Sequence, residues 1–271
     1  MKRYVHFSID DVFDTFKDLA EGSYEDIFEQ PVLGFLKDLH LRYGCTFSGY
    51  CFFRKELPAE GAETKSFLTL DDFSFPKRFR EQFWENHSWL KFGFHALDHE
   101  TSYGPTHFKV RETRGTYEEA REDCKKTHDA LCRLLGCEDM IDHVPRIHYF
   151  AGSKEALGAW KDLQIRGLLS ADDDRIPYDL TEEETLRLKE DFFLNTPDRD
   201  LFLIRTALRL EKTEDVNRAW ESLLKEEKPC IEIFTHEYFM DEPSIRKKFE
   251  GFSRLVKEEG LAYGFAEDAF A

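Results

Sequence analysis

Three apolar runs, far apart in the sequence, each end in side chains that can bind a metal ion or transfer a proton. The runs with their polar ends are Phe7-Ser-Ile-Asp-Asp11, Phe92-Gly-Phe-His-Ala-Leu-Asp-His99 and Ile231-Glu-Ile-Phe-Thr-His236. Short apolar runs of this kind are typical of buried strands. The carboxyl ends of parallel strands meet at one edge of a sheet or one mouth of a barrel. The pattern therefore predicts one polar site built from three strand ends.

The two histidines of the middle run, His95 and His99, are four residues apart. On one helical turn this spacing places both imidazoles on the same side, where they could converge on a divalent ion at roughly 2.0–2.1 Å each. The Asp10-Asp11 pair offers the carboxylate that such a site needs. With ten histidines in the chain, such a pair also arises by chance, and Asp-Asp pairs are common in turns and helix caps. Their position directly after strand-like runs favours the functional interpretation.

Helical stripes and capping signals separate the apolar runs. We expect strands at 4–9, 46–53, 89–94, 167–170, 201–208 and 229–235, a strand or the approach to one at 142–150, and a further short strand at 261–265. We expect helices at 31–43, 76–86, 116–135, 153–162, 215–225 and 243–259, and a charged helix that opens at Thr181. Strands that alternate with helices indicate an α/β fold with a parallel sheet and outer helices. We expect one domain over residues 1–271, closed into a barrel, with insertions near 54–88 and 175–200.

Composition narrows the class of protein. Hydrophobic residues make up 41% of the 271 residues and aromatic residues 15%, which excludes disorder. The net charge of −17 argues against nucleic-acid or anionic-membrane partners. No signal peptide and no run of about 18 apolar residues is present, so we expect a cytoplasmic protein. The six cysteines form no Cys-x-x-Cys pair, which favours reduced thiols over a zinc ribbon or a disulfide framework.

With the strands placed, the order of motifs resembles the polysaccharide deacetylase (NodB-like, carbohydrate esterase family 4) superfamily over nearly the whole chain. Ser8-Ile-Asp-Asp11 resembles its Thr-Phe-Asp-Asp motif, His95-Ala-Leu-Asp-His99 matches His-x-x-x-His, and Phe234-Thr-His236 resembles Leu-x-His. The resemblance implies a distorted (β/α)7 barrel. It also implies that Asp10 is the catalytic base, that His236 is the general acid, and that the metal ligands are Asp11, His95 and His99.

Two middle motifs depart from the family pattern. Arg146-Ile-His-Tyr-Phe150 stands where the family has Arg-x-x-Pro-Tyr and lacks the proline. By resemblance, Arg146 orients the base and the backbone near Tyr149 donates to an oxyanion. Asp172-Asp-Asp-Arg175 stands where the family has an acidic motif with a tryptophan. Asp172 and Asp173 are then the carboxylates that keep the acid histidine charged.

These residues predict a metal-dependent hydrolase that removes an N-acyl (acetyl) group from a carbohydrate or a related small amide. Amide hydrolysis needs a nucleophilic water, stabilisation of charge on the carbonyl oxygen, and a proton for the departing amine. Two imidazoles and one carboxylate favour zinc, with cobalt, nickel or manganese as alternatives. We expect a small soluble N-acylated sugar as substrate. The alternatives are a catalytically degenerate barrel that binds a sugar or a protein partner, and a hydrolase of another amide. The sequence leaves the oligomeric state open.

Overall fold

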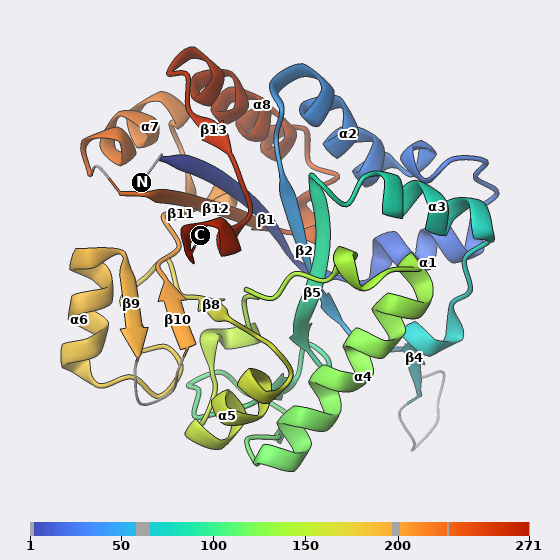
Figure 1. Ribbon diagram of the computed structural model, residues 1–271, viewed down its shortest axis with the longest axis horizontal. Coiled ribbons are helices and arrows are strands. Elements are labelled where there is room, and N and C mark those ends of the chain that lie inside the picture. The colour runs from blue at the N-terminus through green and yellow to red at the C-terminus, as the bar shows by residue number, and fades with distance from the viewer. Residues whose placement is uncertain (1–2, 58–65, 197–200, 227, 271) are drawn as a thin grey trace.

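The centre of the molecule is a sheet of parallel strands in the order β11-β12-β1-β2-β5, with β13 paired to β1 (Figure 1). The computed structural model describes residues 3–57, 66–196, 201–226 and 228–270. The central strands are β1 (Tyr4–Val12), β2 (Phe47–Phe52), β5 (Leu90–Ala96), β11 (Leu208–Arg209), β12 (Cys230–His236) and β13 (Ala262–Tyr263). A second sheet has the order β8-β10-β9 and consists of β8 (Gly167–Leu169), β9 (Phe193–Thr196) and β10 (Leu201–Ile204), with β9 antiparallel. Two short pairs lie outside them: β3 (Arg54–Glu56) with β4 (Phe67–Thr69), and β6 (Thr101–Ser102) with β7 (Glu112–Thr113).

An irregular segment, residues 141–147, joins the two larger sheets. The Asp142 amide donates to the Phe92 carbonyl of β5 at 2.8 Å, and the Leu169 amide of β8 donates to the Pro145 carbonyl at 3.0 Å. On the other side of the second sheet, the chain after β10 returns to β12, where the Ala207 amide donates to the Glu232 carbonyl at 2.8 Å. The expected α/β fold, a distorted barrel with mostly parallel strands, is thereby confirmed.

The strand predicted at 142–150 is wrong. The segment makes only an isolated bridge to β5 at Ile141 and ends in a 3₁₀ turn, His148–Phe150. Pro145 lacks an amide hydrogen, and the Asp142 carboxylate accepts from the Val144 amide at 2.7 Å, which turns the chain. Tyr149 and Phe150 then have φ values of 58° and 56°, which no strand allows.

Eight helices in the described part of the chain surround the sheets (Figure 1). They are α1 (Asp14–Glu21), α2 (Pro31–Tyr43), α3 (Lys77–Glu85), α4 (Tyr117–Leu135), α5 (Lys154–Asp162), α6 (Glu182–Asp191), α7 (Val216–Lys225) and α8 (Pro243–Glu258). All seven predicted helices are present, each within about two residues of the ends that were predicted for it, and α1 was not predicted. Local signals set those ends: Gly44 closes α2 in the left-handed region at φ 79°, and the Thr116 side chain caps α4.

The predicted strand at 201–208 is two strands, β10 and β11, which belong to different sheets. The insertion near 54–88 contains the β3–β4 hairpin and α3, and the insertion near 175–200 contains α6 and β9. Parts of both insertions, residues 58–65 and 197–200, lie outside the described residues. The single domain over residues 1–271 stays a prediction.

Alternate residues of β1 face opposite sides of the sheet, as the pleat requires. Phe7 packs against Phe249 of α8, with ring centroids 5.2 Å apart. His6, Ser8 and Asp10 instead face the barrel interior, where His6 and Ser8 contact side chains of β2 and β12 and Asp10 contacts Arg146 of the irregular segment. The parallel register with β12 pairs them with Glu232, Phe234 and His236 in turn. This register brings Asp10 and His236 side by side at the carboxyl ends of two neighbouring strands.

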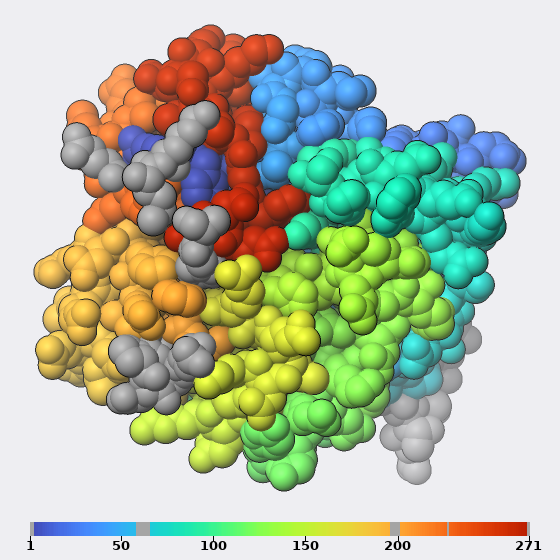
Figure 2. All heavy atoms as spheres, in the orientation of Figure 1, coloured from blue at the N-terminus to red at the C-terminus, as the bar shows by residue number. Residues whose placement is uncertain are grey.

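The first and last strands of the chain lie next to one another. β13 pairs with β1, and Figure 2 shows the blue N-terminal segment beside the red C-terminal one. None of the helices found among the described residues has the length and apolar character that crossing a membrane requires.

Candidate metal and acid–base site

Two β-bulges shape the mouth of the barrel. Between its pairs Ile9↔Gly49 and Val12↔Cys51, β1 has one residue more than β2, and Asp11 adopts a left-handed φ of 63°. Between the pairs Cys51↔Phe94 and Phe52↔Ala96, β5 likewise has one extra residue, His95. A bulge re-aims side chains and is common beside active sites. The two bulges turn Asp11 and His95 toward one another across the strand ends.

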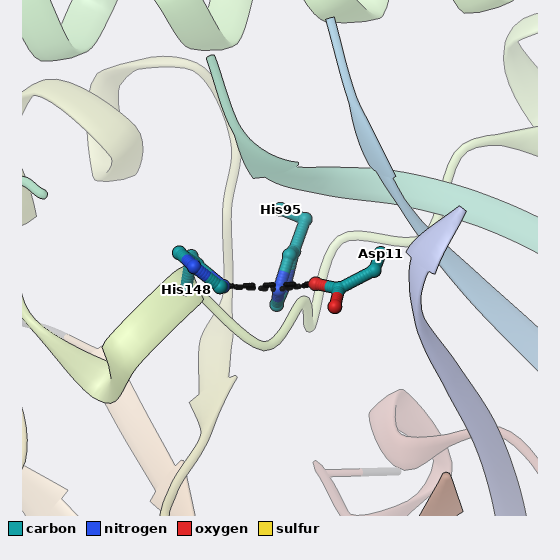
Figure 3. Close-up of side chains that lie close together, drawn as sticks. All are labelled: Asp11, His95 and His148. Atoms are coloured by element: carbon teal, nitrogen blue, oxygen red, sulfur yellow. Dashed lines mark hydrogen bonds and ion pairs between the residues drawn. The ribbon is translucent and has the colours of Figure 1, made fainter. Parts of the chain in front are cut away.

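Three side chains converge at this point: Asp11, His95 and His148 (Figure 3). His95 Nε2 lies 3.1 Å from Asp11 Oδ1 and 3.1 Å from His148 Nδ1, and His148 Nδ1 lies 3.6 Å from Asp11 Oδ1. A tetrahedral zinc ion with bonds of about 2.0–2.1 Å separates its ligand atoms by roughly 3.3–3.4 Å. All three side chains are buried. The triangle therefore has the size and the donor set of a zinc site.

Hydrogen bonds on the far side of each imidazole explain why a cation fits. His95 Nδ1 donates to the Arg146 carbonyl at 2.5 Å, and His148 Nε2 donates to the His99 carbonyl at 3.1 Å. In neutral imidazoles the other nitrogens then present lone pairs to Asp11. Asp11 Oδ1 is buried and has no hydrogen-bond donor. Burial also holds the pKa of His148 well below its ordinary value, which keeps the ring neutral. Three lone pairs that face one another without a proton are the arrangement that a metal ion satisfies.

The structure places His99 outside this group, which is the one group of three or more such side chains found among the described residues. The premise of a shared helical turn is wrong, because His95 belongs to β5 and the chain bends after it. The His99 ring is exposed. Its carbonyl oxygen accepts from His148 Nε2 and, at 2.9 Å, from the Tyr149 hydroxyl. His99 thus contacts His148 through its backbone, and the two rings lie with their centroids 4.9 Å apart. The ligand role of His99 stays a prediction, and His148 is a candidate ligand that the sequence did not suggest.

Asp10 lies beside Asp11 but faces the barrel interior. Arg146 Nη1 donates to Asp10 Oδ1 at 2.8 Å, and both side chains are buried. Arg146 stacks on the Phe234 ring at 3.9 Å from its centroid. The hydrogen bond from Arg146 to Asp10 is the contact that the resemblance implies for an arginine that orients the base. Tyr149 is adjacent to His148 in the strained 3₁₀ turn, and its role as an oxyanion donor stays a prediction.

His236, the last residue of β12, pairs with a carboxylate that sequence reasoning did not identify. Its Nδ1 donates to Glu211 Oε1 at 2.6 Å, and the Thr235 hydroxyl donates to the other Glu211 oxygen at 2.9 Å. Burial opposes the charged imidazole, but the hydrogen bond to Glu211 and the negative charges of Asp10, Asp11 and Glu211 outweigh it and raise the pKa of His236 above its ordinary value. Burial also opposes ionisation of Glu211, and His236 in turn lowers the pKa of that carboxyl.

The carboxylates predicted to tune His236 are bound elsewhere. Asp172 Oδ1 accepts from Arg209 Nη2 at 2.5 Å, and Asp173 pairs with Arg175 at 2.6 Å. Arg209 Nε is 3.9 Å from Glu211, so Asp172 reaches the histidine only through two intervening side chains. The direct role that we expected for Asp172 and Asp173 therefore falls to Glu211, which follows the short strand β11 beside β12.

We expect Glu211→Gln to lower the pKa of His236, because the variant removes the charge that stabilises the imidazolium. Since the wild-type pKa is raised, the imidazolium is then lost at a lower pH than in the wild type, and its population at neutral pH falls. An NMR titration of the imidazole of His236 measures this directly. Asp172→Asn is the matched control, because it removes a carboxylate without touching His236. An equal or larger shift in the control would show that Asp172 dominates after all.

A cavity of about 510 Å³ lies over these strand ends. Its wall includes Asp11 from the converging group, the neighbouring His99, the aromatic rings of Phe52 and Tyr238, and charged side chains such as Arg54. Tyr238 stacks on the His236 imidazole with centroids 5.2 Å apart and is 60% exposed. The cavity is within the size range of small-molecule sites. It gives a small ligand access to the candidate metal ligand Asp11.

Sequence reasoning missed His148 and Glu211. His148 lies two residues after Arg146, so the position of that arginine could have drawn attention to it. Glu211 directly follows the apolar run 201–208 and its flanking Arg209-Leu210. Glu211 comes shortly after a predicted strand, as Asp11 and His236 do, whereas His148 lies inside the predicted strand 142–150, where it was not expected to reach a strand end.

No protein-family model matches the chain, and no curated protein does. Among solved structures, it is similar to a 4-alpha-glucanotransferase from Thermococcus litoralis, with 12% identity, a TM-score of 0.54, and coverage of 99% of this chain and 40% of that one. At this identity the similarity concerns the fold alone.

Two further similarities have lower TM-scores. A family 4 acetyl xylan esterase from Clostridium thermocellum, in complex with a cobalt ion, is 10% identical over 99% of this chain and 90% of its own, with a TM-score of 0.49. A peptidoglycan N-acetylglucosamine deacetylase is 13% identical over 98% of this chain and 87% of its own, with a TM-score of 0.48.

Proposed function

We propose that this protein is a zinc-dependent hydrolase that removes an acyl group from the nitrogen of a small N-acylated sugar or a related amide. The observation that carries the proposal is the triangle of Asp11, His95 and His148. Two imidazole nitrogens and a buried carboxylate oxygen without a hydrogen-bond donor each direct a lone pair toward the same point. Asp10 and His236, adjacent through the register of β1 and β12, supply a base and an acid beside it.

When bound, the metal supplies Lewis-acid stabilisation of the acyl oxygen and makes water easier to deprotonate. Asp10 accepts the proton of the attacking water, and Arg146 keeps the carboxylate aimed. The water oxygen forms a bond to the acyl carbon, and the carbon–nitrogen bond then breaks. His236 gives a proton from Nε2 to the departing nitrogen while Glu211 holds Nδ1–H. The products are an amine and a carboxylate.

The cavity supports a small substrate. Its volume of about 510 Å³ has room for one or two sugar rings, and its wall combines aromatic faces with ion-paired charged side chains. Arg54 and Arg111 are both neutralised by carboxylates, Asp98 among them, so neither offers an unpaired cation to an anionic substrate. These features support a neutral amide over a phosphorylated ligand. We propose zinc as the metal, and cobalt, nickel and manganese are tested beside it.

The proposal is tested by acetate release. The protein is loaded with one equivalent of each metal and incubated with N-acetylglucosamine, short N-acetylated oligosaccharides and simple N-acetyl amides, and free acetate is measured. We expect release from an N-acetyl sugar with zinc and none after chelation. If the metal is bound and no amide is cleaved, the protein is a degenerate barrel that binds a ligand, and the proposed reaction is wrong.

A further inference from the structure

A glutamate lies among the apolar residues of the first half of β12. Glu232 stands between Ile231 and Ile233 in β12, and its side chain is completely buried. A buried carboxylate is costly unless charged or polar partners compensate for it. The role of Glu232 in the proposed reaction is not explained by the metal site or by the acid–base pair.

The partners of Glu232 lead to the proposed base. Its Oε2 accepts from Arg146 Nη2 at 2.5 Å, and its Oε1 accepts from the Ser8 hydroxyl at 2.5 Å. Ser8 Oγ in turn accepts from Arg146 Nη1 at 2.9 Å. Arg146 Nη1 also donates to Asp10. Glu232 therefore holds the guanidinium by a direct bond and through Ser8, while the other end of the guanidinium holds Asp10.

The register of the two strands explains this geometry. On the interior face, β1 presents His6, Ser8 and Asp10 opposite Glu232, Phe234 and His236 of β12. Arg146 lies flat on the middle ring, Phe234, and reaches Glu232 deep in the barrel and Asp10 at its mouth. Thr206 Oγ1 accepts from Arg146 Nη2 at 3.1 Å. Glu232 is thus the charged residue that fixes how far the Arg146 guanidinium extends from the mouth into the barrel interior.

We infer that Glu232 is a positioning residue, which acts through Arg146 to hold Asp10 where it can accept the proton of the attacking water. The inference rests on the proposed function. A positioning role differs from a general stabilising role in one respect: the length of the side chain at position 232 should affect the rate of the reaction. Asp10 is separated from Glu232 by one guanidinium, whereas the metal ligand His95 contacts the backbone carbonyl of Arg146. A change at position 232 therefore acts on the base through the guanidinium, and the zinc content of the variant shows whether His95 is also affected.

Two conservative variants separate reach from charge. Glu232→Asp keeps the charge but shortens the side chain by one methylene, so the carboxylate withdraws from Arg146. Glu232→Gln keeps the length and an oxygen acceptor but removes the charge. We expect Glu232→Asp to lower kcat about 10- to 100-fold with KM within about threefold, as for a small misplacement of a catalytic group. We expect Glu232→Gln to stay within about fivefold of the wild type.

The controls address stability and metal. Glu267→Asp shortens a different ion-paired glutamate, one that holds Lys91 at 2.6 Å and makes no contact with Arg146, and it should change kcat by less than about twofold. Bound zinc, by elemental analysis, and thermal unfolding are measured for every variant. In an Asp10→Asn background, Glu232→Asp should have almost no further effect, because the group that it positions is already disabled.

A crystal structure of Glu232→Asp decides the inference without any activity. We expect the contact between Arg146 Nη1 and Asp10 Oδ1, 2.8 Å in the wild type, to open beyond hydrogen-bond distance. An unchanged contact overturns the inference, and so does an active Glu232→Asp variant or an additive loss in the Asp10→Asn background. If the wild type cleaves no amide, the proposed function fails, while this contact still shows whether Glu232 holds Asp10 in place.

Discussion

Replacing His148 by alanine is expected to abolish stoichiometric zinc binding, whereas His99→Ala is expected to retain it. His148 offers Nδ1 to the same point as Asp11 and His95, while His99 contributes its carbonyl oxygen, which alanine keeps. Loss of a residue that merely orients a ligand costs about 10–100-fold in metal affinity, so loss of a ligand should cost at least about 100-fold. Elemental analysis and zinc titration of the purified variants measure the difference.

The same pair of variants also tests the motif that the sequence suggested. If His99→Ala loses its zinc and His148→Ala keeps it, the ligand set of the His-x-x-x-His motif holds and our assignment is wrong. Asp11→Ala and His95→Ala belong to both ligand sets and should lose the metal in either case. Far-UV circular dichroism should show a retained fold in all four variants, because the apolar core of the barrel does not depend on the metal.

Replacing Asp10 by asparagine is expected to lower kcat by about 10²–10⁴-fold with the zinc retained, the range for loss of a general base. Asparagine keeps the shape of the side chain and can still accept from Arg146, but it cannot take the proton of the attacking water. His236→Ala is expected to fall in the same range for amides. It should slow an activated ester much less, because a good leaving group departs without a proton. Steady-state kinetics with both substrates check this.

Variants that are misfolded or have lost zinc are recognised because they slow both substrates, the amide and the activated ester. A damaged or zinc-depleted variant slows the amide and the activated ester equally, and its metal content or unfolding temperature reveals it. If both variants hydrolyse amides at the wild-type rate, Asp10 and His236 are not the base and the acid, although the fold and the metal site stand. The amide-to-ester ratio of His236→Ala is the most discriminating single number.

Local sequence signals predicted the elements and part of the site. Pro31 and Gly44 delimit α2, and Thr116 and Gly136 delimit α4, because caps and glycines act within a few residues of the chain. Apolar runs placed Asp10, Asp11, His95 and His236 at strand ends. Parallel pairing of β12, β1, β2 and β5 then gathered these ends at one mouth, as the alternation of strands and helices led us to expect.

The third ligand depended on tertiary structure. A spacing of four residues places two histidines together on a helix, but an extended strand rises about 3.3 Å per residue and would separate them by roughly 13 Å. His95 lies in a strand and the chain bends after it, so His99 accepts from His148 through its carbonyl, while its exposed ring packs beside the His148 ring with centroids 4.9 Å apart. His148 arrives from a segment 53 residues away in sequence, through a turn with strained backbone that no motif announces.

The carboxylates that hold the acid and the base were likewise decided by strand pairing. Glu211 reaches His236 because β11 pairs with β12 in parallel, and Glu232 reaches Arg146 because its register places it on the interior face. Sequence by itself determined which residues end strands and which cap helices, since those preferences are local. Only the tertiary structure decided which side chains share a proton or a metal, because hydrogen bonds and ligand geometry depend on register and bulges set by long-range pairing.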